Sequence, residues 1–182
     1  MNLIKVQLIG LDQLKRQIDS ASNKVKNEID AELQASAMEF VGLAKRDLSN
    51  QAGDTGTLLN SIQYKKETEN TYSVFVPSSV YYSGYIEFGT RNQAKVPAGL
   101  EDVASEFKSQ KNKGTLKLID AIRAWVIRKG IETEEKEINR AAFAIARSIY
   151  EKGIAPRPFF YKQIVPVQES LIRRVKAILD GI

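Results

Sequence analysis

The stretch that decides the fold is LDQLKRQIDSASNKVKNEIDAELQASAMEFVGLAKRDL, residues 11–48. Its apolar residues recur every three or four positions, at Leu11, Leu14, Ile18, Ala21, Val25, Ile29, Leu33, Ala37, Phe40, Ala44 and Leu48. A mean spacing of about 3.7 residues indicates a single amphipathic helix with one continuous apolar stripe.

The length of this helix raises the question of what covers the stripe. About 40 residues at 1.5 Å each give about 60 Å, whereas a globule of this chain length is about 40 Å across. The helix therefore either bends, most easily at residues 20–23, or has part of its stripe covered by another chain. We favour the second alternative and expect Val25 and Ile29 at that contact.

Short strands are predicted on either side of the helix. Ile4, Val6 and Leu8 alternate with polar residues, which is typical of a half-buried strand, and Gly10 ends it. After a polar turn at residues 50–57, residues 61–65 and 72–76 are predicted to pair as a hairpin.

The second half of the chain is predicted to be mainly helical. Residues 116–128 and 133–152 each carry an apolar stripe at helical spacing and end at a Lys-Gly pair. Residues 155–158 should be extended, and a last helix should begin at Pro166. We predict that the two middle helices pack on each other or on the long helix, with Lys108–Gly114 a mobile loop.

The expected fold class is therefore α+β, in one domain spanning residues 1–182. A small antiparallel sheet should be packed by the long amino-terminal helix and by the carboxy-terminal helix. Residues 91–153 should form a helical insertion. With 182 residues, of which 43% are hydrophobic, the chain can bury a core without disulfides or a metal.

Composition removes most kinds of active site. The chain has no Cys and no His, so thiolate nucleophiles, Cys/His zinc sites and imidazole acid–base catalysis are excluded. Carboxylate, Lys, Ser/Thr or Tyr chemistry remains, but no catalytic cluster of these residues is recognisable. We expect no enzyme, no cofactor and no metal site.

The charge is mildly basic, with a formal net charge of +5. The first 50 residues hold seven basic and seven acidic side chains, whereas the segment from Arg147 to the end holds seven basic and three acidic ones. No apolar run approaches the roughly 18 residues needed to cross a bilayer. We therefore expect a cytosolic protein without a signal peptide or a membrane anchor.

Asp54-Thr55-Gly56 spells the triplet of aspartic proteases, which place it after an apolar strand. Here the polar residues 49–53 precede it. We favour a structural reading, in which Asp54 or Thr55 caps a short helix beginning at Gly56.

The aromatic segment around residue 85 has three readings. Tyr81, Tyr85 and Phe88 share one helical face, with Tyr82 beside them, which would suit either base stacking or a core or subunit contact. We favour the contact, because no basic groove flanks them. Glu87 lies in apolar company without a second carboxylate, so a structural hydrogen bond or an inter-subunit pair is favoured over acid–base chemistry.

Two basic segments near the carboxyl end also have structural readings. Pro156–Phe160 has the proline spacing of a proline-rich ligand, but Phe159 and Phe160 favour docking on a core. Arg173, Arg174 and Lys176 could contact phosphate, but at the end of a helix they also complement its dipole, and we favour this reading.

Three segments occur in order after the long helix: DTGTL leading to Ser61-Ile62, then EFGT at residues 87–90, then RPFF at residues 157–160. Together they resemble the phage neck and tail-completion family typed by the tenth-gene product of a lambdoid coliphage. The resemblance covers residues 1–90 and 141–182. The link between EFGT and PF is much longer here than in the family pattern, because residues 91–140 intervene.

The resemblance implies a non-enzymatic virion protein that forms a ring, six-fold or twelve-fold, at the head–tail junction of a long-tailed phage. Its neighbours would be the connector and tail-tube proteins, and genomic DNA would pass through the lumen without sequence-specific binding. It would be assembled in the host cytoplasm. With the two helix residues named above, the expected subunit or partner contacts are Val25, Ile29, Asp54, Gly56, Tyr81, Tyr82, Glu87, Phe88, Gly89, Thr90, Phe159 and Phe160.

Two other classes of protein stay open on the sequence alone. A pI of about 9.3 would suit a nucleic-acid-binding regulator, whose binding would fall steeply with salt. The long helix would suit a coiled-coil adaptor, in which residues 10–50 would dimerise by themselves.

Overall fold

The computed structural model describes residues 2–6, 22–50, 56–80, 82–95, 98–102 and 115–181. The chain divides into two compact units. The first, Met1–Ser83 with Pro158–Ile182, is called the α+β unit below, and the second, Gly84–Arg157, the helical unit. The predicted insertion thus corresponds to a compact unit, whose boundaries lie several residues outside residues 91–153.

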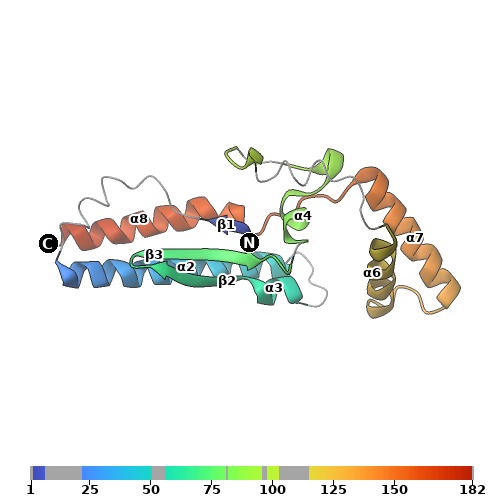
Figure 1. Cartoon of the computed structure of the whole chain (residues 1–182), viewed down its shortest axis with the longest axis horizontal. Coiled ribbons are helices and arrows are strands. Elements are labelled where there is room, and N and C mark those ends of the chain that lie inside the picture. The colour runs from blue at the N-terminus through green and yellow to red at the C-terminus, as the bar shows by residue number, and fades with distance from the viewer. Residues whose placement is uncertain are drawn as a thin grey trace. The chain divides into compact units, whose positions relative to one another are not determined.

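The α+β unit is built on α2 (Asn23–Asn50), which appears blue to cyan in Figure 1. The helix begins after Ser22, whose hydroxyl accepts a hydrogen bond from the amide of Val25 at 3.5 Å. Its buried residues follow the predicted stripe, and they are Val25, Ile29, Ser36, Ala37, Phe40, Ala44 and Leu48. The predicted helix is thus confirmed from residue 23 onward, and its part at residues 11–21 lies outside the described residues.

A three-stranded antiparallel sheet packs on α2. Its strands are β1 (Asn2–Val6), β2 (Gln63–Thr68) and β3 (Thr71–Pro77), in the order β1-β3-β2. In the central strand, Val74 lies opposite Val6 on one side and Tyr64 on the other. Val74 and Val76 are buried, while β2 and β3 contact α2.

The predicted hairpin is confirmed, with one boundary corrected. Asn70 makes the turn with a φ of 55°, a left-handed conformation that Asn tolerates better than most residues. The first strand begins at Gln63 because a short helix, α3 (Thr57–Ser61), takes up the residues before it.

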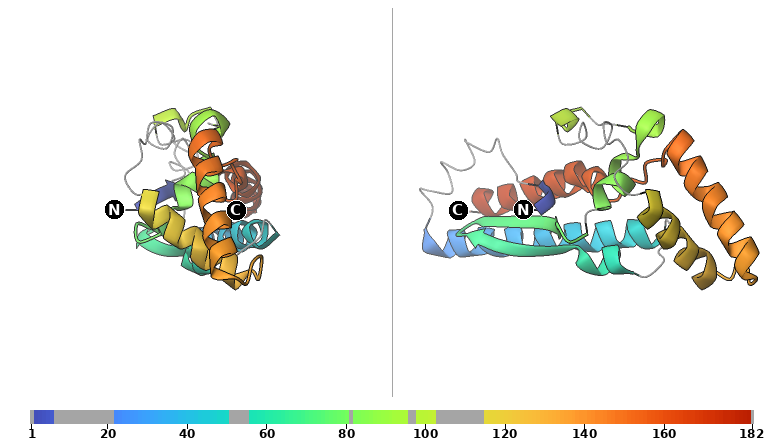
Figure 2. Two further views of the ribbon diagram at one scale, coloured as in Figure 1. Left: turned by 90° about the vertical axis from the view of Figure 1, so that its right-hand side faces the viewer. Right: turned by 45° about the vertical axis from the view of Figure 1, so that its right-hand side comes forward.

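The carboxy-terminal helix α8 (Ile164–Asp180) follows the 3₁₀ turn η2 (Tyr161–Gln163) and runs antiparallel along α2 (Figures 1 and 2). The predicted stripe is confirmed, since Val167, Leu171 and Val175 are buried. The helix begins two residues before Pro166. This is possible because the amides of a first turn have no acceptor within the helix, so a proline there removes little.

The packing of α8 corrects the expectation for the two helix residues. Val25 and Ile29 form one buried cluster with Leu171 and Val175, and Ile29 is 0% exposed. The cover that we assigned to a neighbouring subunit comes from the carboxy-terminal helix of the same chain. A helix longer than a compact globule can be covered within one chain here, because two long helices lie side by side in this unit.

The helical unit contains the turn η1 (Arg91–Gln93), α6 (Thr115–Arg128) and α7 (Glu135–Lys152). The short helix α4 (Ser83–Phe88) leads into it. As predicted, α6 and α7 pack on each other, around a buried cluster of Ile122, Val126, Ile138, Ala142 and Ala146. The loop expected at Lys108–Gly114 lies outside the described residues.

A core substitution tests the correction. Ile29→Ala is expected to lower the free energy of unfolding of the isolated chain by about 2 to 5 kcal/mol, because it leaves a cavity between α2 and α8. The control Val165→Ala, at a side chain that is 60% exposed, should change it by less than about 0.5 kcal/mol. Denaturant unfolding at low protein concentration measures both changes. If the stability of the Ile29 variant were unchanged, Ile29 would be better explained as a contact with another subunit.

Candidate functional site

The EFGT segment lies at the end of α4, and its glycine turns the chain. The amide of Gly89 donates to the carbonyl of Tyr85 at 3.0 Å, and its φ of 74° lies in the left-handed region. The carbonyl of Phe88 then accepts a hydrogen bond from the amide of Lys95 at 2.9 Å. The segment thus ends one helix and begins the return of the chain.

The same segment is bound to residues far along the sequence. The amide of Thr90 donates to the carbonyl of Ile154 at 3.0 Å, and the amide of Ile154 donates to the hydroxyl of Thr90 at 2.8 Å. The amide of Arg157 donates to the carbonyl of Ile86 at 2.7 Å. We call this pairing of residues 86–90 with residues 153–157 the clasp. It joins the EFGT motif to the segment that leads into RPFF.

Two glycines allow the clasp to close. A Cβ at Gly89 would lie 2.7 Å from the carbonyl oxygen of Ile154 and 2.9 Å from the nitrogen of Pro156. A Cβ at Gly153, whose φ is 84°, would collide with the carbonyl oxygen of Thr90. Sequence reasoning identified Gly89 but assigned Gly153 only to a helix end, because nothing local shows that two backbones meet there.

The clasp changes the interpretation of the predicted contact residues. Glu87 and Phe88 are 0% and 1% exposed, and Gly89 is buried. Glu87 has an interaction partner within the chain. None of the three offers surface to a second subunit. Tyr82 and Thr90 are half-buried, and Tyr81 lies outside the described residues.

The RPFF segment anchors the α+β unit from within. Phe159 and Phe160 are both 0% exposed, and the ring of Phe160 meets that of Phe40 edge-on, with centroids 4.9 Å apart. The sequence prediction that they dock on a core is confirmed. Their assignment as subunit contacts is corrected, because both side chains are fully buried within the chain and Phe160 packs on Phe40 of α2.

Polar contacts hold η2 beside that aromatic pair. The ammonium of Lys162 lies 2.8 Å from a carboxylate oxygen of Asp47. The side chain of Gln163 donates to Asp47 and, at 3.2 Å, to the carbonyl of Phe159. The hydrogen bond from Lys162 lowers the pKa of Asp47, which favours the charged form of this carboxylate.

The DTG turn leads into α3. Gly56 stands at the helix N-cap with a φ of 72°, and its carbonyl accepts a hydrogen bond from the amide of Asn60 at 2.8 Å. The helix therefore begins at Thr57, one residue after the predicted start, and its N-cap position is held by a glycine, which has no side chain to donate or accept a hydrogen bond. Asp54 and Thr55, the predicted caps, lie outside the described residues.

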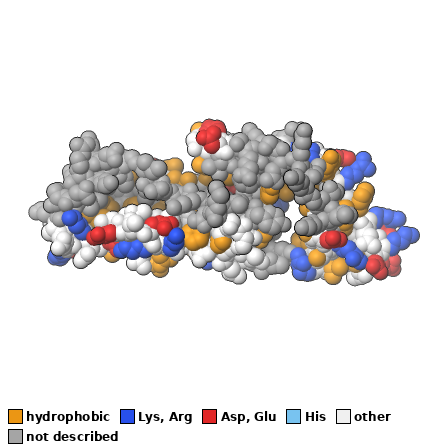
Figure 3. Space-filling model, viewed as in Figure 1, with side chains coloured by type: hydrophobic (Ala, Val, Ile, Leu, Met, Phe, Trp, Pro, Cys, Tyr) orange, Lys and Arg blue, Asp and Glu red, His pale blue; other side chains and the backbone are white. Residues whose placement is uncertain are grey.

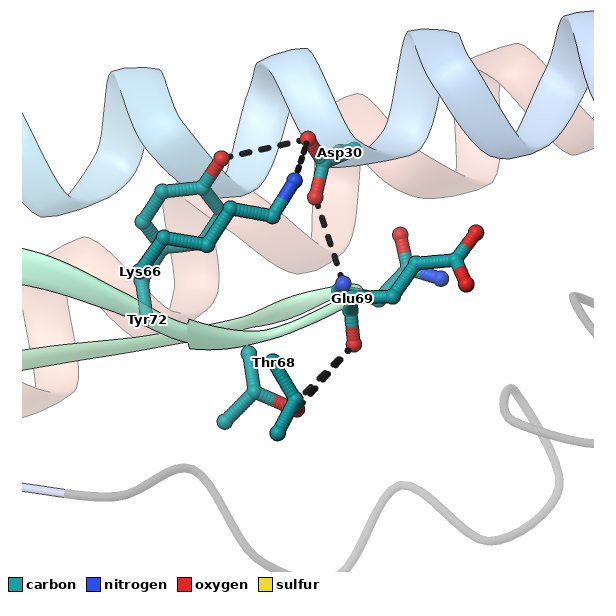
Figure 4. Close-up of polar contacts among 7 residues, drawn as sticks. Asp30, Lys66, Thr68, Glu69 and Tyr72 are labelled. Atoms are coloured by element: carbon teal, nitrogen blue, oxygen red, sulfur yellow. Dashed lines mark hydrogen bonds and ion pairs between the residues drawn. The ribbon is translucent and has the colours of Figure 1, made fainter.

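A carboxylate on α2 fixes the tip of the hairpin (Figure 4). Asp30 accepts hydrogen bonds from the ammonium of Lys66 at 2.6 Å, the hydroxyl of Tyr72 at 3.1 Å and the amide of Asn70 at 3.2 Å. Burial tends to raise the pKa of Asp30, but these donors together lower it. Sequence reasoning missed this cluster, because its partners lie about 40 residues away and follow no motif.

Arg174 makes a second polar link, between α8 and α2. Its guanidinium lies 2.7 Å from a carboxylate oxygen of Glu32 and 3.2 Å from one of Glu39, and it also donates to the hydroxyl of Ser36. We had expected this residue to complement the dipole of its own helix. The structure gives it instead an inter-helix role, which a helix sequence alone does not reveal.

The helical unit exposes several large apolar side chains, namely Ile127, Ile131, Phe143 and Tyr150, each about half exposed. Figure 3 shows hydrophobic and charged side chains of both signs exposed together over α6 and α7. The guanidinium of Arg91 lies 4.5 Å from the ring centre of Tyr150. Exposed apolar side chains of this size can pack against a protein partner.

Neither metal chemistry nor a membrane span is found in the part of the chain that the structure describes. No group of three or more acidic side chains there could hold a metal ion. No helix among these residues is long and apolar enough to cross a bilayer.

Comparison with known proteins gives one match. Residues 12–89 match the model of a family described as "Bacteriophage HK97-gp10, putative tail-component". The match confirms the resemblance inferred from the sequence, over the long helix, the DTG turn, the hairpin and the EFG residues. No curated protein and no solved structure matches the chain.

The clasp predicts that two glycines with similar backbone angles differ in their tolerance of alanine. Gly89→Ala should lower the free energy of unfolding by about 2 to 5 kcal/mol, because strain at positive φ is combined with a backbone collision. Gly130→Ala is the matched control, since Gly130 also has a positive φ, of 61°, but a Cβ there would meet nothing within 4 Å. It should lose only about 1 to 2 kcal/mol. Equal losses in thermal or denaturant unfolding would contradict the clasp.

The Asp30 cluster predicts a dependence of stability on pH. Asp30→Ala should cost about 1 to 2 kcal/mol at neutral pH, a modest value because the Lys66 pair is partly exposed. Since the folded-state pKa of Asp30 lies below its ordinary value of 3.8, the contribution is complete above that value and disappears as the pH falls through the folded-state pKa.

The measurement is denaturant unfolding of both proteins from neutral to acid pH. The stability difference between the wild type and Asp30→Ala should shrink in acid. Asp120→Ala, at an exposed carboxylate of α6, is the control and should show little difference at any pH. A difference for Asp30→Ala that stays constant down to the lowest pH would argue against the charged cluster.

Proposed function

We propose that this protein is a structural virion protein of a long-tailed phage and forms a ring at the head–tail junction, where it joins the portal connector to the tail tube. The observation that carries the proposal is the match of residues 12–89 to a phage tail-component family. Its coarser part, a component of the tail or neck region, is what the description of that family supports. The ring and its place at the junction are our inference.

The described residues support a role in packing. Two of the segments that carry the resemblance, EFGT and RPFF, serve backbone pairing and core anchoring. A protein of this kind acts through its shape and through its exposed surfaces. The apolar side chains exposed in the helical unit, namely Ile127, Ile131, Phe143 and Tyr150, are available for such contacts.

A ring requires heterologous contacts, in which two different surfaces of one chain meet across each interface and the rotation closes. We propose six-fold or twelve-fold symmetry, with genomic DNA passing through the lumen without sequence-specific binding. Of the contact residues predicted from the sequence, we retain those that are half-buried or outside the described residues. They are Asp54, Gly56, Tyr81, Tyr82 and Thr90.

Purified particles test the proposal. Mass spectrometry should find the chain in virions at a fixed ratio to the tail-tube protein, and gold-labelled antibody should mark the junction between head and tail. Particles from which the gene is deleted should show full heads and unattached tails. A chain present in infected cells but absent from particles would overturn the virion role, and label along the whole tail would overturn the place at the junction.

Purified particles and the purified protein also distinguish the proposed virion role from the alternative of a nucleic-acid-binding regulator. A regulator would be absent from particles and would bind duplex DNA with an affinity that falls steeply as salt rises. A neck component that only surrounds DNA should show weak binding without sequence preference.

A further inference from the structure

One face of α2 is left uncovered by the part of the chain that the structure describes. The exposed residues on it follow a spacing of three and four, and they are Glu28, Ala31, Ala35, Met38 and Gly42. We call this the outer face of α2. Met38 is 54% exposed, and a Cβ at Gly42 would meet nothing within 4 Å. The opposite side of the same helix packs on the sheet and on α8.

Charged residues stand at both ends of this face, and the amino end carries Lys24 one turn before Glu28. Glu28 is at the amino end, and Lys45 and Arg46 follow Gly42 at the carboxyl end. Elsewhere on α2, Asp30, Glu32, Glu39 and Asp47 all have basic partners. Within the described parts of the chain, by contrast, no ion pair involves Glu28, Lys45 or Arg46, although Arg46 helps to lower the pKa of the neighbouring Asp47.

The pattern is complementary to itself when the chain direction is reversed. A two-fold axis beside residues 36 and 37 would bring Ala31 opposite Gly42 of a second copy and Ala35 opposite Met38. The same axis would bring Glu28 opposite Lys45 and Arg46, and this would happen twice because of the symmetry. A parallel arrangement would instead place Glu28 against Glu28, and each basic pair against itself, which costs energy.

The geometry allows all these contacts in one register. Positions that repeat every three and four residues form the seam of a shallow helix pair, which crosses at about 20° with the axes about 8 to 10 Å apart. At that angle, residues nine positions from the axis separate sideways by only about 5 Å, which long charged side chains can span. Ala31, Ala35 and Gly42 permit the close approach, and Met38 fills the space opposite Ala35.

We propose that the outer face of α2 binds a second copy of this chain, antiparallel and two-fold, in the free protein. The self-complementary charges favour this occupant over an unrelated protein, which would have no reason to match both ends. The contact closes on itself and so differs from a ring contact. It goes beyond the proposed function, because it concerns chains that are not yet assembled.

Cysteine cross-linking tests the register directly, since the chain has no cysteine of its own. Ala31→Cys and Gly42→Cys are made as two separate full-length proteins, at exposed positions where the new side chain fits. After mild oxidation, a mixture of the two should give a disulfide-linked dimer, whereas neither variant alone should. In the antiparallel pair, each residue 31 lies opposite residue 42 but about 16 Å along the axis from the other residue 31, which is too far for a disulfide.

Charge reversal provides the second arm. Sedimentation of the unmodified chain should show a dimer that dissociates on dilution. Glu28→Lys should weaken the dimer by about tenfold or more, and so should Lys45→Glu with Arg46→Glu. The triple variant should recover the dimer, because every pair is then restored with reversed signs. Glu169→Lys, on the exposed side of α8, is the control and should leave the association unchanged.

Three results would overturn the proposal: a chain that sediments as a monomer at every concentration, cross-links formed by each cysteine variant alone, or a triple variant that fails to recover. Thermal unfolding of each variant checks that the fold is intact, and these changes, which fall at exposed positions except for the half-buried Lys45, should leave it nearly unchanged. The presence of the protein in virions is measured separately. The dimer and the ring can therefore fail independently of each other.

Discussion

The rest of the α+β unit depends on the burial of one side of α2. A single helix of 28 residues cannot form a core by itself, and here its stripe is divided between two partners. The sheet covers it from one direction, and α8, which comes from the far end of the chain, covers it from another. Removing water from this shared seam is the main stabilising force, and the polar links of Asp30, Asp47 and Arg174 fix which partner lies where.

The clasp bears on how the chain accommodates the helical unit. About 74 residues separate the two parts of the α+β unit in the sequence, and these two parts must still pack together. The chain leaves the α+β unit after Ser83 and returns at Pro158. Hydrogen bonds between Ile86 and Arg157 and between Thr90 and Ile154 hold the outgoing and returning segments together. The backbones can approach closely enough only because both close contacts are made at glycines. A long insertion is thereby tolerated without lengthening the path that Phe159 and Phe160 must follow to reach the core.

The proposed ring and the proposed dimer would both use side chains that are not needed for packing within the chain. Glu87, Phe88, Phe159 and Phe160 resemble interface residues in sequence, but they are fully used within the chain. Of the six large apolar side chains that are exposed among the described residues, four lie in the helical unit, and the charged Glu28 and Arg46 lie exposed on α2. Residues that carry the resemblance thus maintain the fold, and less conspicuous residues remain for partners.

The sequence by itself determined the helices, the hairpin and the docking of the two phenylalanines, because each follows from the spacing of apolar residues or from a local turn. It also excluded imidazole and thiolate chemistry, because those side chains are absent. Only the tertiary structure decided that α8 covers Val25 and Ile29, that Gly153 meets Thr90, and that Asp30 binds the hairpin tip. These contacts join residues from about 40 to 150 positions apart, and a pattern that repeats every two or four residues holds no information about partners at such distances.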